Sequence, residues 1–134
     1  MKYLLDTNIC IYIIKRKPRE VIERFLALEV GDIAISSVST SELYYGASKS
    51  QRVVENTNAL NEFLMPIEVL SYNEASSVIY GEIRARLERK GQVIGAMDMM
   101  IAAHALSLNI PVVTNNVKEF ERVEGLMVEN WVNR

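Results

Sequence analysis

Four acidic residues that are far apart in the chain stand near short apolar runs: Asp6, Glu42, Asp98 and Glu119. Asp6 directly follows YLL, Glu42 comes a few residues after IAIS, and Glu119 comes shortly after IPVVT. Asp98 follows GQVIGAM at the start of an Ala-rich segment. Clustered carboxylates repel one another, and hard cations such as Mg²⁺ and Mn²⁺ take oxygen ligands. If the fold gathers these acids, they predict metal-assisted cleavage of a phosphodiester bond.

Each acid also has an explanation that needs no catalysis. Asp6 is a suitable N-cap for a helix that follows it, and Glu42 has the S-x-x-E spacing of a capping box with Ser39. Asp98 near a helix start is favoured by the helix dipole, and Glu119 in VKEFER is typical of a solvated charge. One helix terminus can serve both roles, so the hypothesis depends on the four acids as a set.

The soft and imidazole ligands of metals are scarce in this sequence. The chain has one His and one Cys, which argues against a dedicated zinc site. His104 lies about 240° round its helix from Asp98, so we expect a packing or surface residue and not a catalytic base. Cys10 lies in an apolar run and is expected to be a small buried side chain.

Composition predicts one globular domain over residues 1–134, since 49% of the residues are hydrophobic. A single cysteine forms no internal disulfide, no signal peptide is evident, and the longest apolar stretch, Ile9–Ile14, is too short for a bilayer. We therefore expect a cytoplasmic protein without membrane contact. The net charge of −2 excludes nucleic-acid binding through bulk charge. Local candidates for RNA contacts are Tyr44, Tyr45 and two basic patches: Lys15, Arg16, Lys17 and Arg19, and Arg84, Arg86, Arg89 and Lys90.

Short apolar runs alternate with helical patterns along the chain. Strands are predicted at 3–5, 33–36, 67–70 and 110–114, with an edge strand at 126–131. Helices are predicted at 8–15, 18–31, from about 40, at 51–64, from a capping box at Ser71 and Glu74 to about 90, and at 95–108, with a short helix or turn at 117–123. This alternation favours an α/β domain with a mainly parallel sheet covered on both faces. Sites in such sheets form beyond the carboxyl ends of the strands, and Asp6, Glu42 and Glu119 each come after a predicted strand.

Four segments, LLDTNICIY, ISSVSTSELYYG, GQVIGAMDMMIAAHAL and VVTNNVKEF, have the layout of a known family. Together they resemble the PIN-domain ribonucleases, and more closely the VapC toxins of bacterial toxin–antitoxin pairs. The resemblance runs from Lys2 to Trp131. It implies a PIN-like three-layer α/β/α sandwich and a Mg²⁺-dependent endoribonuclease, with Mn²⁺ as an alternative ion. The implied reaction hydrolyses RNA to 3′-hydroxyl and 5′-phosphate ends.

The resemblance also implies a site. Asp6, Glu42 and Asp98 match the first three acids of the family, and we expect Asp6 and Asp98 to ligate the main ion while Glu42 ligates it or orients water. Many relatives have a fourth acid where this chain has Asn116, and Glu119 is the nearest remaining carboxylate. An amide adds no charge, so the number of metal ions is left open.

The implied partners follow from the same resemblance. The substrate is RNA, most closely initiator tRNA cut in its anticodon stem-loop, so that the toxin inhibits translation. A cognate VapB-type antitoxin is expected to place an Arg or Lys in the acidic pocket and to contact DNA itself, so that the toxin meets DNA only indirectly. A homodimer or a toxin–antitoxin hetero-oligomer is expected.

Three rival interpretations are weaker. A Mg²⁺-dependent phosphatase of the haloacid-dehalogenase type needs D-x-D, and the chain has Asn8 in place of the second acid. A receiver domain needs a phosphorylated Asp after its third strand, where this chain has LSYNE. A catalytically inactive PIN-like binding module has Asn116 as its only support.

Overall fold

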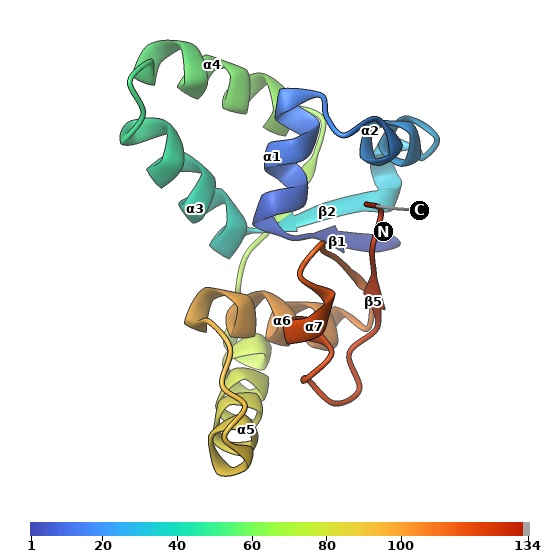
Figure 1. Cartoon of the computed structure of the whole chain (residues 1–134), viewed down its shortest axis with the longest axis vertical. Helices are drawn as coiled ribbons and strands as arrows, with labels where there is room; N and C mark the ends of the chain where they lie inside the picture. Colours follow the sequence, from blue (N-terminus) through green and yellow to red (C-terminus); the bar gives the residue numbers. More distant parts are fainter. Residues whose placement is uncertain (133–134) are drawn as a thin grey trace.

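The structure is a computed structural model that describes residues 1–132. Its strands and helices alternate in the order that the sequence predicts (Figure 1). The elements are β1 (Tyr3–Leu5), α1 (Thr7–Lys15), α2 (Arg19–Leu26), the 3₁₀ turn η1 (Val30–Asp32), β2 (Ile33–Ser36), α3 (Ser37–Ser48), α4 (Val53–Leu64), β3 (Glu68–Leu70), α5 (Glu74–Lys90), α6 (Ala96–Leu108), β4 (Val112–Val113), α7 (Val117–Phe120) and β5 (Val128–Glu129).

The five strands form one sheet in the order β3-β2-β1-β4-β5, and every neighbouring pair is parallel. In Figure 1, α1 to α4 lie on one side of the sheet, and α5 and α6 lie on the other. The predicted three-layer α/β/α arrangement with a mainly parallel sheet is therefore confirmed. No helix within residues 1–132 is long and apolar enough to cross a bilayer.

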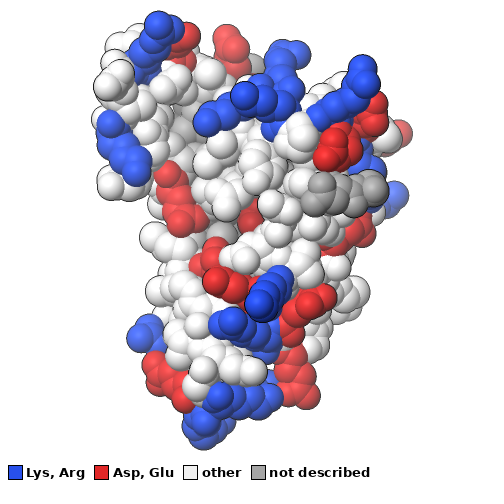
Figure 2. All heavy atoms as spheres, viewed as in Figure 1, with Lys and Arg blue, Asp and Glu red and all other residues white. Residues whose placement is uncertain are grey.

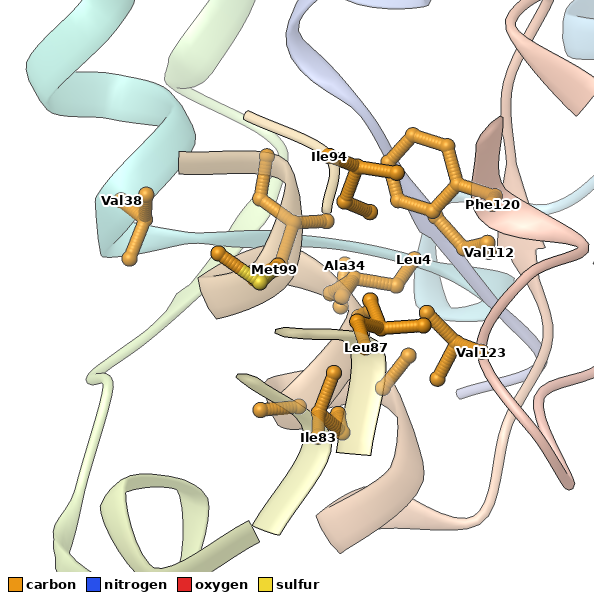
Figure 3. Packing of buried hydrophobic residues seen from close by; sticks show 14 residues of the cluster. Leu4, Ala34, Val38, Ile83, Leu87, Ile94, Met99, Val112, Phe120 and Val123 are labelled. Atoms are coloured by element: carbon orange, nitrogen blue, oxygen red, sulfur yellow. The ribbon is translucent and has the colours of Figure 1, made fainter. Parts of the chain in front are cut away.

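Two hydrophobic cores lie on the two faces of the sheet, because successive side chains of a strand point to opposite faces. Leu4, Ala34 and Val112 belong to the core beneath α5 and α6, where Met99 and Leu87 pack against them (Figure 3). The neighbouring strand residues, including Leu5, Ile35 and Val113, belong to the core beneath α1. Burial of both faces explains why the strands have continuous apolar runs instead of alternating ones.

His104 and Cys10 have the structural roles that their positions predict. His104 is 1% exposed, and its Nδ1 lies 2.8 Å from Ser36 Oγ, while its ring meets Tyr72 edge-on. Burial lowers the pKa of His104 below its ordinary value. Cys10 is fully buried, and burial raises the pKa of its thiol.

Both predicted capping boxes are wrong. Ser36 caps α3, because its hydroxyl accepts a hydrogen bond from the amide of Val38, so the helix begins at Ser37 and not near residue 40. Asn73 caps α5 by accepting a hydrogen bond from the amide of Ser76. In each case a polar residue close to the predicted cap competes for the same role, and S-x-x-E spacing does not distinguish the two.

The predicted helix from Pro18 to Gly31 is also too long. The α2 helix ends at Leu26, and a separate 3₁₀ turn covers Val30–Asp32. Glu29 accepts a hydrogen bond from this turn while the Asp32 side chain accepts one from the Glu29 amide, which forms a capping box within the predicted helix. The turn fixes the entry into β2 directly after it.

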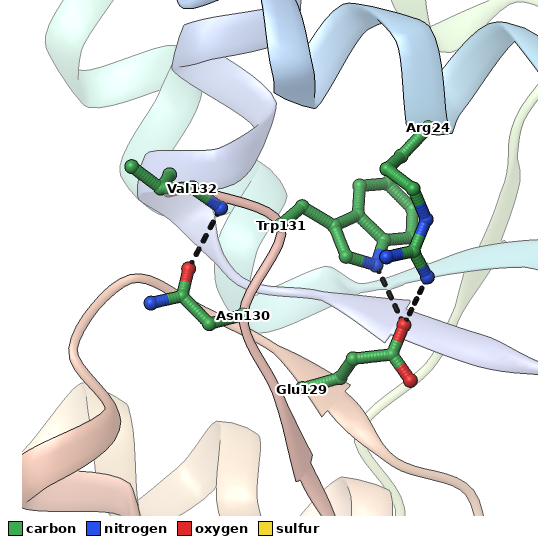
Figure 4. A network of polar contacts seen from close by, with 5 residues as sticks. All are labelled: Arg24, Glu129, Asn130, Trp131 and Val132. Carbon is green, nitrogen blue, oxygen red and sulfur yellow. Dashed lines mark hydrogen bonds and ion pairs between the residues drawn. The ribbon is translucent and has the colours of Figure 1, made fainter. Parts of the chain in front are cut away.

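The carboxyl-terminal segment is joined to α2 by a polar cluster (Figure 4). Glu129 Oε1 accepts hydrogen bonds from Arg24 Nη2 at 2.5 Å and from Trp131 Nε1 at 2.8 Å. The Arg24 guanidinium also lies 5.2 Å from the centroid of the Trp131 ring, and the ring itself is fully buried and meets Tyr3 edge-on. A buried indole with its N–H satisfied anchors this segment in the core.

Candidate active site

Three neighbouring strands end at the same level of the sheet. Leu5 of β1 is in register with Ile35 of β2 and with Val113 of β4. The residues that follow these three in the chain lie at the carboxyl edge of the sheet, and all are polar: Asp6, Ser36 and Thr114. This is the edge at which ligands bind in open parallel sheets.

Asp6 is buried at this edge, with 4% of its surface exposed. It caps α1 as predicted, because its Oδ1 accepts a hydrogen bond from the Ile9 amide at 2.9 Å. A hydrogen bond with the Thr114 side chain also stabilises the carboxylate. Desolvation nevertheless raises the pKa of Asp6 from 3.8 to about 6, and the charges of Asp98 and Glu42 add to this rise. A cap alone does not require such burial.

Glu42 lies in the middle of α3 and does not act in a capping box. Its Oε1 accepts a hydrogen bond from the Thr7 hydroxyl, which joins α3 to the first turn of α1. Ser39, one turn earlier, is fully buried, and its hydroxyl has no hydrogen-bond partner within residues 1–132. The structural explanation for Glu42 that the sequence offers is therefore removed.

Asp98 is in the first turn of α6, as predicted, and is half-buried. Desolvation raises its pKa from 3.8 to about 6, and the charges of Glu42 and Glu119 raise it further. The dipole of α6 favours a negative charge at this terminus, yet the neighbouring acids and burial outweigh that effect. Asp98 therefore lies close enough to other carboxylates to interact with them electrostatically.

Asn116 and Glu119 form a pair at the start of α7. Asn116 Nδ2 donates a hydrogen bond to Glu119 Oε1 at 3.0 Å, and the Asn116 amide donates to Thr114 Oγ1 at 2.9 Å. Glu119 is thus held in place and half-buried, which corrects its interpretation as a solvated charge. The Thr114 hydroxyl links this pair to Asp6, so the loop after β4 and the cap of α1 are joined.

The four acids interact as one group. The charges of Asp98 and Glu42 raise the pKa of Asp6, and the charges of Glu42 and Glu119 raise the pKa of Asp98. Figure 2 shows acidic side chains at the waist of the molecule, with Lys and Arg above and below them. Oxygen donors with this much negative charge suit a hard divalent cation. No three His, Cys, Asp or Glu side chains within residues 1–132 are already arranged to hold a metal ion.

Two hydroxyl residues of the site were not singled out from the sequence: Thr7 and Thr114. Thr7 holds Glu42, and Thr114 contacts both Asp6 and the Asn116 amide. Their signal in the sequence is a threonine directly beyond a strand, in LLDTN and in VVTNN. Such positions favour hydroxyl side chains that bond to neighbouring backbone or carboxylate groups.

The candidate RNA-contact residues are exposed, but some of them already form hydrogen bonds or ion pairs within the protein. Tyr44 is 41% exposed and donates a hydrogen bond to Asn61, and Tyr45 is 65% exposed. In the second basic patch, Arg84 pairs with Glu88 and Arg86 pairs with Glu124, which reduces the charge available there. In the first patch, Lys15, Arg16 and Lys17 form no ion pair within residues 1–132, whereas Arg19 pairs with Glu23.

Comparison with known proteins gives matches over almost the whole chain. A family model described as the PIN domain matches residues 3–126. A tRNA(fMet)-specific endonuclease VapC from Shigella flexneri is 50% identical over 131 residues, which covers 98% of each chain.

Solved structures agree with these matches. A chain in the crystal structure of DNA-bound VapBC from Salmonella typhimurium superposes with a TM-score of 0.92 at 45% identity, covering 98% of both chains. A chain of VapBC2 from Rickettsia felis, bound to a DNA fragment from their promoter, superposes with a TM-score of 0.90 at 42% identity, covering 98% and 99% of the two chains. The protein therefore belongs to the PIN-domain family, among its VapC ribonucleases.

Proposed function

We propose that this chain is the toxin of a VapBC toxin–antitoxin pair and acts as a metal-dependent endoribonuclease. One observation carries the enzymatic part. Asp6, Glu42, Asp98 and Glu119 come from four different segments and interact at the carboxyl edge of the sheet, where burial and mutual repulsion raise the pKa of two of them. Retaining such a costly group of charges favours a role in holding a cation over a structural one.

The side chains have distinct proposed roles. Asp6 and Asp98 are the ligands of a divalent cation, for which we favour Mg²⁺ over Mn²⁺, since PIN nucleases generally depend on a divalent metal. When bound, the cation supplies Lewis acidity and positive charge for hydrolysis of a phosphodiester. Glu42, fixed by Thr7, ligates the ion or orients the attacking water, and Glu119 and Asn116 complete the polar wall. The chain itself contributes position and charge.

The substrate that we propose is initiator tRNA, cut in its anticodon stem-loop. The relative from Shigella flexneri is named a tRNA(fMet)-specific endonuclease and is 50% identical over 98% of this chain. An RNA loop exposes bases that can leave their stack and enter a protein surface, whereas a regular A-form helix does not. A tRNA substrate would also place the protein in the cytoplasm.

The partner that we propose is a VapB-type antitoxin. The similar structures from Salmonella typhimurium and Rickettsia felis are VapBC assemblies bound to DNA. A cationic side chain of the antitoxin, Arg or Lys, would relieve the repulsion among Asp6, Glu42 and Asp98 in place of a metal ion. In this arrangement the antitoxin contacts DNA, and the toxin takes part as a homodimer or as a subunit of the hetero-oligomer. We also propose that residues 1–134 form one domain.

An inactive binding module is the second candidate, and Asn116 is the observation that favours it, because an amide at this position adds no charge to the site. A hydrolysis assay separates the two. End-labelled total tRNA and purified initiator tRNA are incubated with the protein in Mg²⁺ and in chelator, together with Asp6→Ala, Asp98→Asn and the control Glu82→Gln, an exposed acid of α5.

The expected result is one cut in initiator tRNA that requires Mg²⁺, disappears in Asp6→Ala and Asp98→Asn, and persists in Glu82→Gln. The loss is expected to be at least about a hundredfold, because a metal ligand acts on every charged species of the reaction. If folded wild-type protein cuts no RNA, or the two site variants cut as well as wild type, the binding module is the better description.

A further inference from the structure

A groove of about 330 Å³ lies between α1, α3 and α4. In Figure 1, these three helices lie on the same side of the sheet. Its walls are aliphatic, and they come from all three helices: Ile11 and Ile14, Leu43 and Ala47, and Leu60. The volume of the groove falls within the range of small-molecule sites (~300–1,000 Å³). The proposed role of the acids in hydrolysis does not explain the groove.

The groove and the acidic site share one residue, Glu42. Glu42 lines the groove, and the same carboxylate accepts the Thr7 hydrogen bond and acts on both Asp6 and Asp98. Leu43 and Gly46 continue the same side of α3 away from the acids. A polymer whose phosphodiester lies at the acids therefore has its neighbouring nucleotide next to the mouth of the groove.

The polar groups of the groove match a nucleotide. Lys15 lines it without an ion pair within residues 1–132, so its ammonium is available to a backbone phosphate. Asn56 also lines it, and its Nδ2 donates to Ser50 Oγ at 2.9 Å, which fixes an amide at the wall. Flat base faces pack on aliphatic side chains, amides bond to base edges, and ammonium groups pair with phosphates.

We propose that this groove binds one nucleobase of the RNA substrate, adjacent to the phosphodiester that is cut. The proposal rests on the proposed ribonuclease function and adds a specificity subsite to it. Continuity with the acids through Glu42 and the unpaired Lys15 favours a nucleotide over a segment of a protein partner, which remains an outcome of the test.

The chain offers a matched pair of variants. Gly46 lies in the middle of α3 and lines the groove, and a Cβ added there meets no atom within 4 Å. Gly46→Leu therefore fills the groove while it improves helix propensity, so the fold is retained. Gly81 in the middle of α5 has equally open space, and Gly81→Leu is the control for the same exchange away from the groove.

The substrates are an anticodon stem-loop with its bases intact and two versions that carry an abasic nucleotide on either side of the mapped cut. For wild type and Gly81→Leu, one abasic version is expected to lower kcat/KM by about tenfold, the size of a lost base contact. Gly46→Leu is expected to cut intact RNA about tenfold more slowly than wild type does. Removal of the base is then expected to cause no further loss of rate. On that abasic RNA, Gly46→Leu and wild type are therefore expected to have the same rate.

Three results would overturn the proposal. The first is that Gly46→Leu cuts intact RNA at the wild-type rate. The second is that its cleavage rate falls by the same factor relative to wild type on intact and on abasic RNA. The third is that it loses only its affinity for an antitoxin, which would assign the groove to a protein partner. Anisotropy of labelled RNA in chelator separates the subsite from the ribonuclease function. If wild type binds RNA in chelator but does not cut it in Mg²⁺, and Gly46→Leu weakens the binding, the subsite alone is supported. If wild type neither binds RNA in chelator nor cuts it in Mg²⁺, both proposals are overturned.

Discussion

The hydroxyl of Thr7 donates a hydrogen bond to the carboxylate of Glu42, which joins the first turn of α1 to the middle of α3. The two residues are 35 positions apart in the sequence. A hydrogen bond to a charged acceptor contributes more than a neutral one, about 1.5–3 kcal/mol, and here it fixes a carboxylate beside Asp6. Thr7 is therefore a positioning residue of the site.

Thr7→Val is expected to lower kcat/KM for RNA cleavage by about tenfold, because Glu42 is then free to leave its place. Thr7→Ser keeps the hydroxyl and should restore most of the rate, which a purely structural role of the threonine methyl group would not allow. Steady-state cleavage of a labelled anticodon stem-loop measures both. Equal rates for wild type and Thr7→Val would show that Glu42 needs no such support.

Asp6→Asn is expected to stabilise the metal-free protein while it abolishes cleavage. The pKa of Asp6 is raised from 3.8 to about 6 in the folded state, so the folded protein binds this proton more tightly than the unfolded chain. The resulting stability is present below about pH 4 and is lost as the pH rises through 6. Asn keeps an oxygen that can cap α1 at the Ile9 amide but carries no charge.

Urea denaturation in chelator measures this effect. At pH 7.5 Asp6→Asn should be more stable than wild type by about 1–2 kcal/mol, and the difference should shrink toward pH 4. Saturating Mg²⁺ should reverse the order, because only wild type has the ligand. A variant that is less stable than wild type at pH 7.5 in chelator would mean that the charged form of Asp6 stabilises the fold.

Asn116→Asp tests how many charges the site accepts. Asn116 now donates to Glu119, and the substitution replaces this hydrogen bond with repulsion between two carboxylates. The Tm in chelator is expected to fall, and Mg²⁺ should raise the Tm by about 2–4 °C more than it does for wild type. Differential scanning calorimetry measures both shifts. Asn58→Asp, on the exposed side of α4, makes the same change of charge and should show neither shift.

Trp131→Ala is expected to lower the free energy of unfolding by about 3–5 kcal/mol, because it empties a fully buried site next to Tyr3 and frees Arg24 and Glu129. Urea denaturation is the measurement. Val54→Ala, at a side chain that is 75% exposed, should change the value by less than about 0.5 kcal/mol. A small effect of Trp131→Ala would mean that the carboxyl-terminal segment is not part of the cooperative fold.

Much of the fold was predictable because the strands are buried on both faces and the helices between them have clear ends. IAIS at 33–36 forms β2 without any shift of its bounds, and Gly91 ends α5 in the left-handed region at a φ of 66°. Local competition limited the rest. Ser36 and Asn73 took the caps that Ser39 and Ser71 were expected to take, since several adjacent residues have similar capping ability.

The site was predictable as a set of residue types but not as a geometry. LLDTN shows Asp6 directly after a strand, and VVTNN comes shortly before Glu119, whereas the support from Thr7 and Thr114 depends on contacts between segments that are far apart in the chain. The sequence favours a surface charge for Glu119, because its hydrogen bond from Asn116 and its proximity to Asp98 depend on the folded chain. The roles of these residues in cleavage remain predictions.

The strand order β3-β2-β1-β4-β5 has a consequence for the synthesis of this protein. The first strand to be made lies at the centre of the sheet, and its neighbour β4 is made only after more than a hundred residues. Asp6 and Glu42 are therefore synthesised before Asp98 and Glu119. A nascent chain carries two of the four acids and an open sheet, so the acidic site is assembled only when nearly all of the chain has been made.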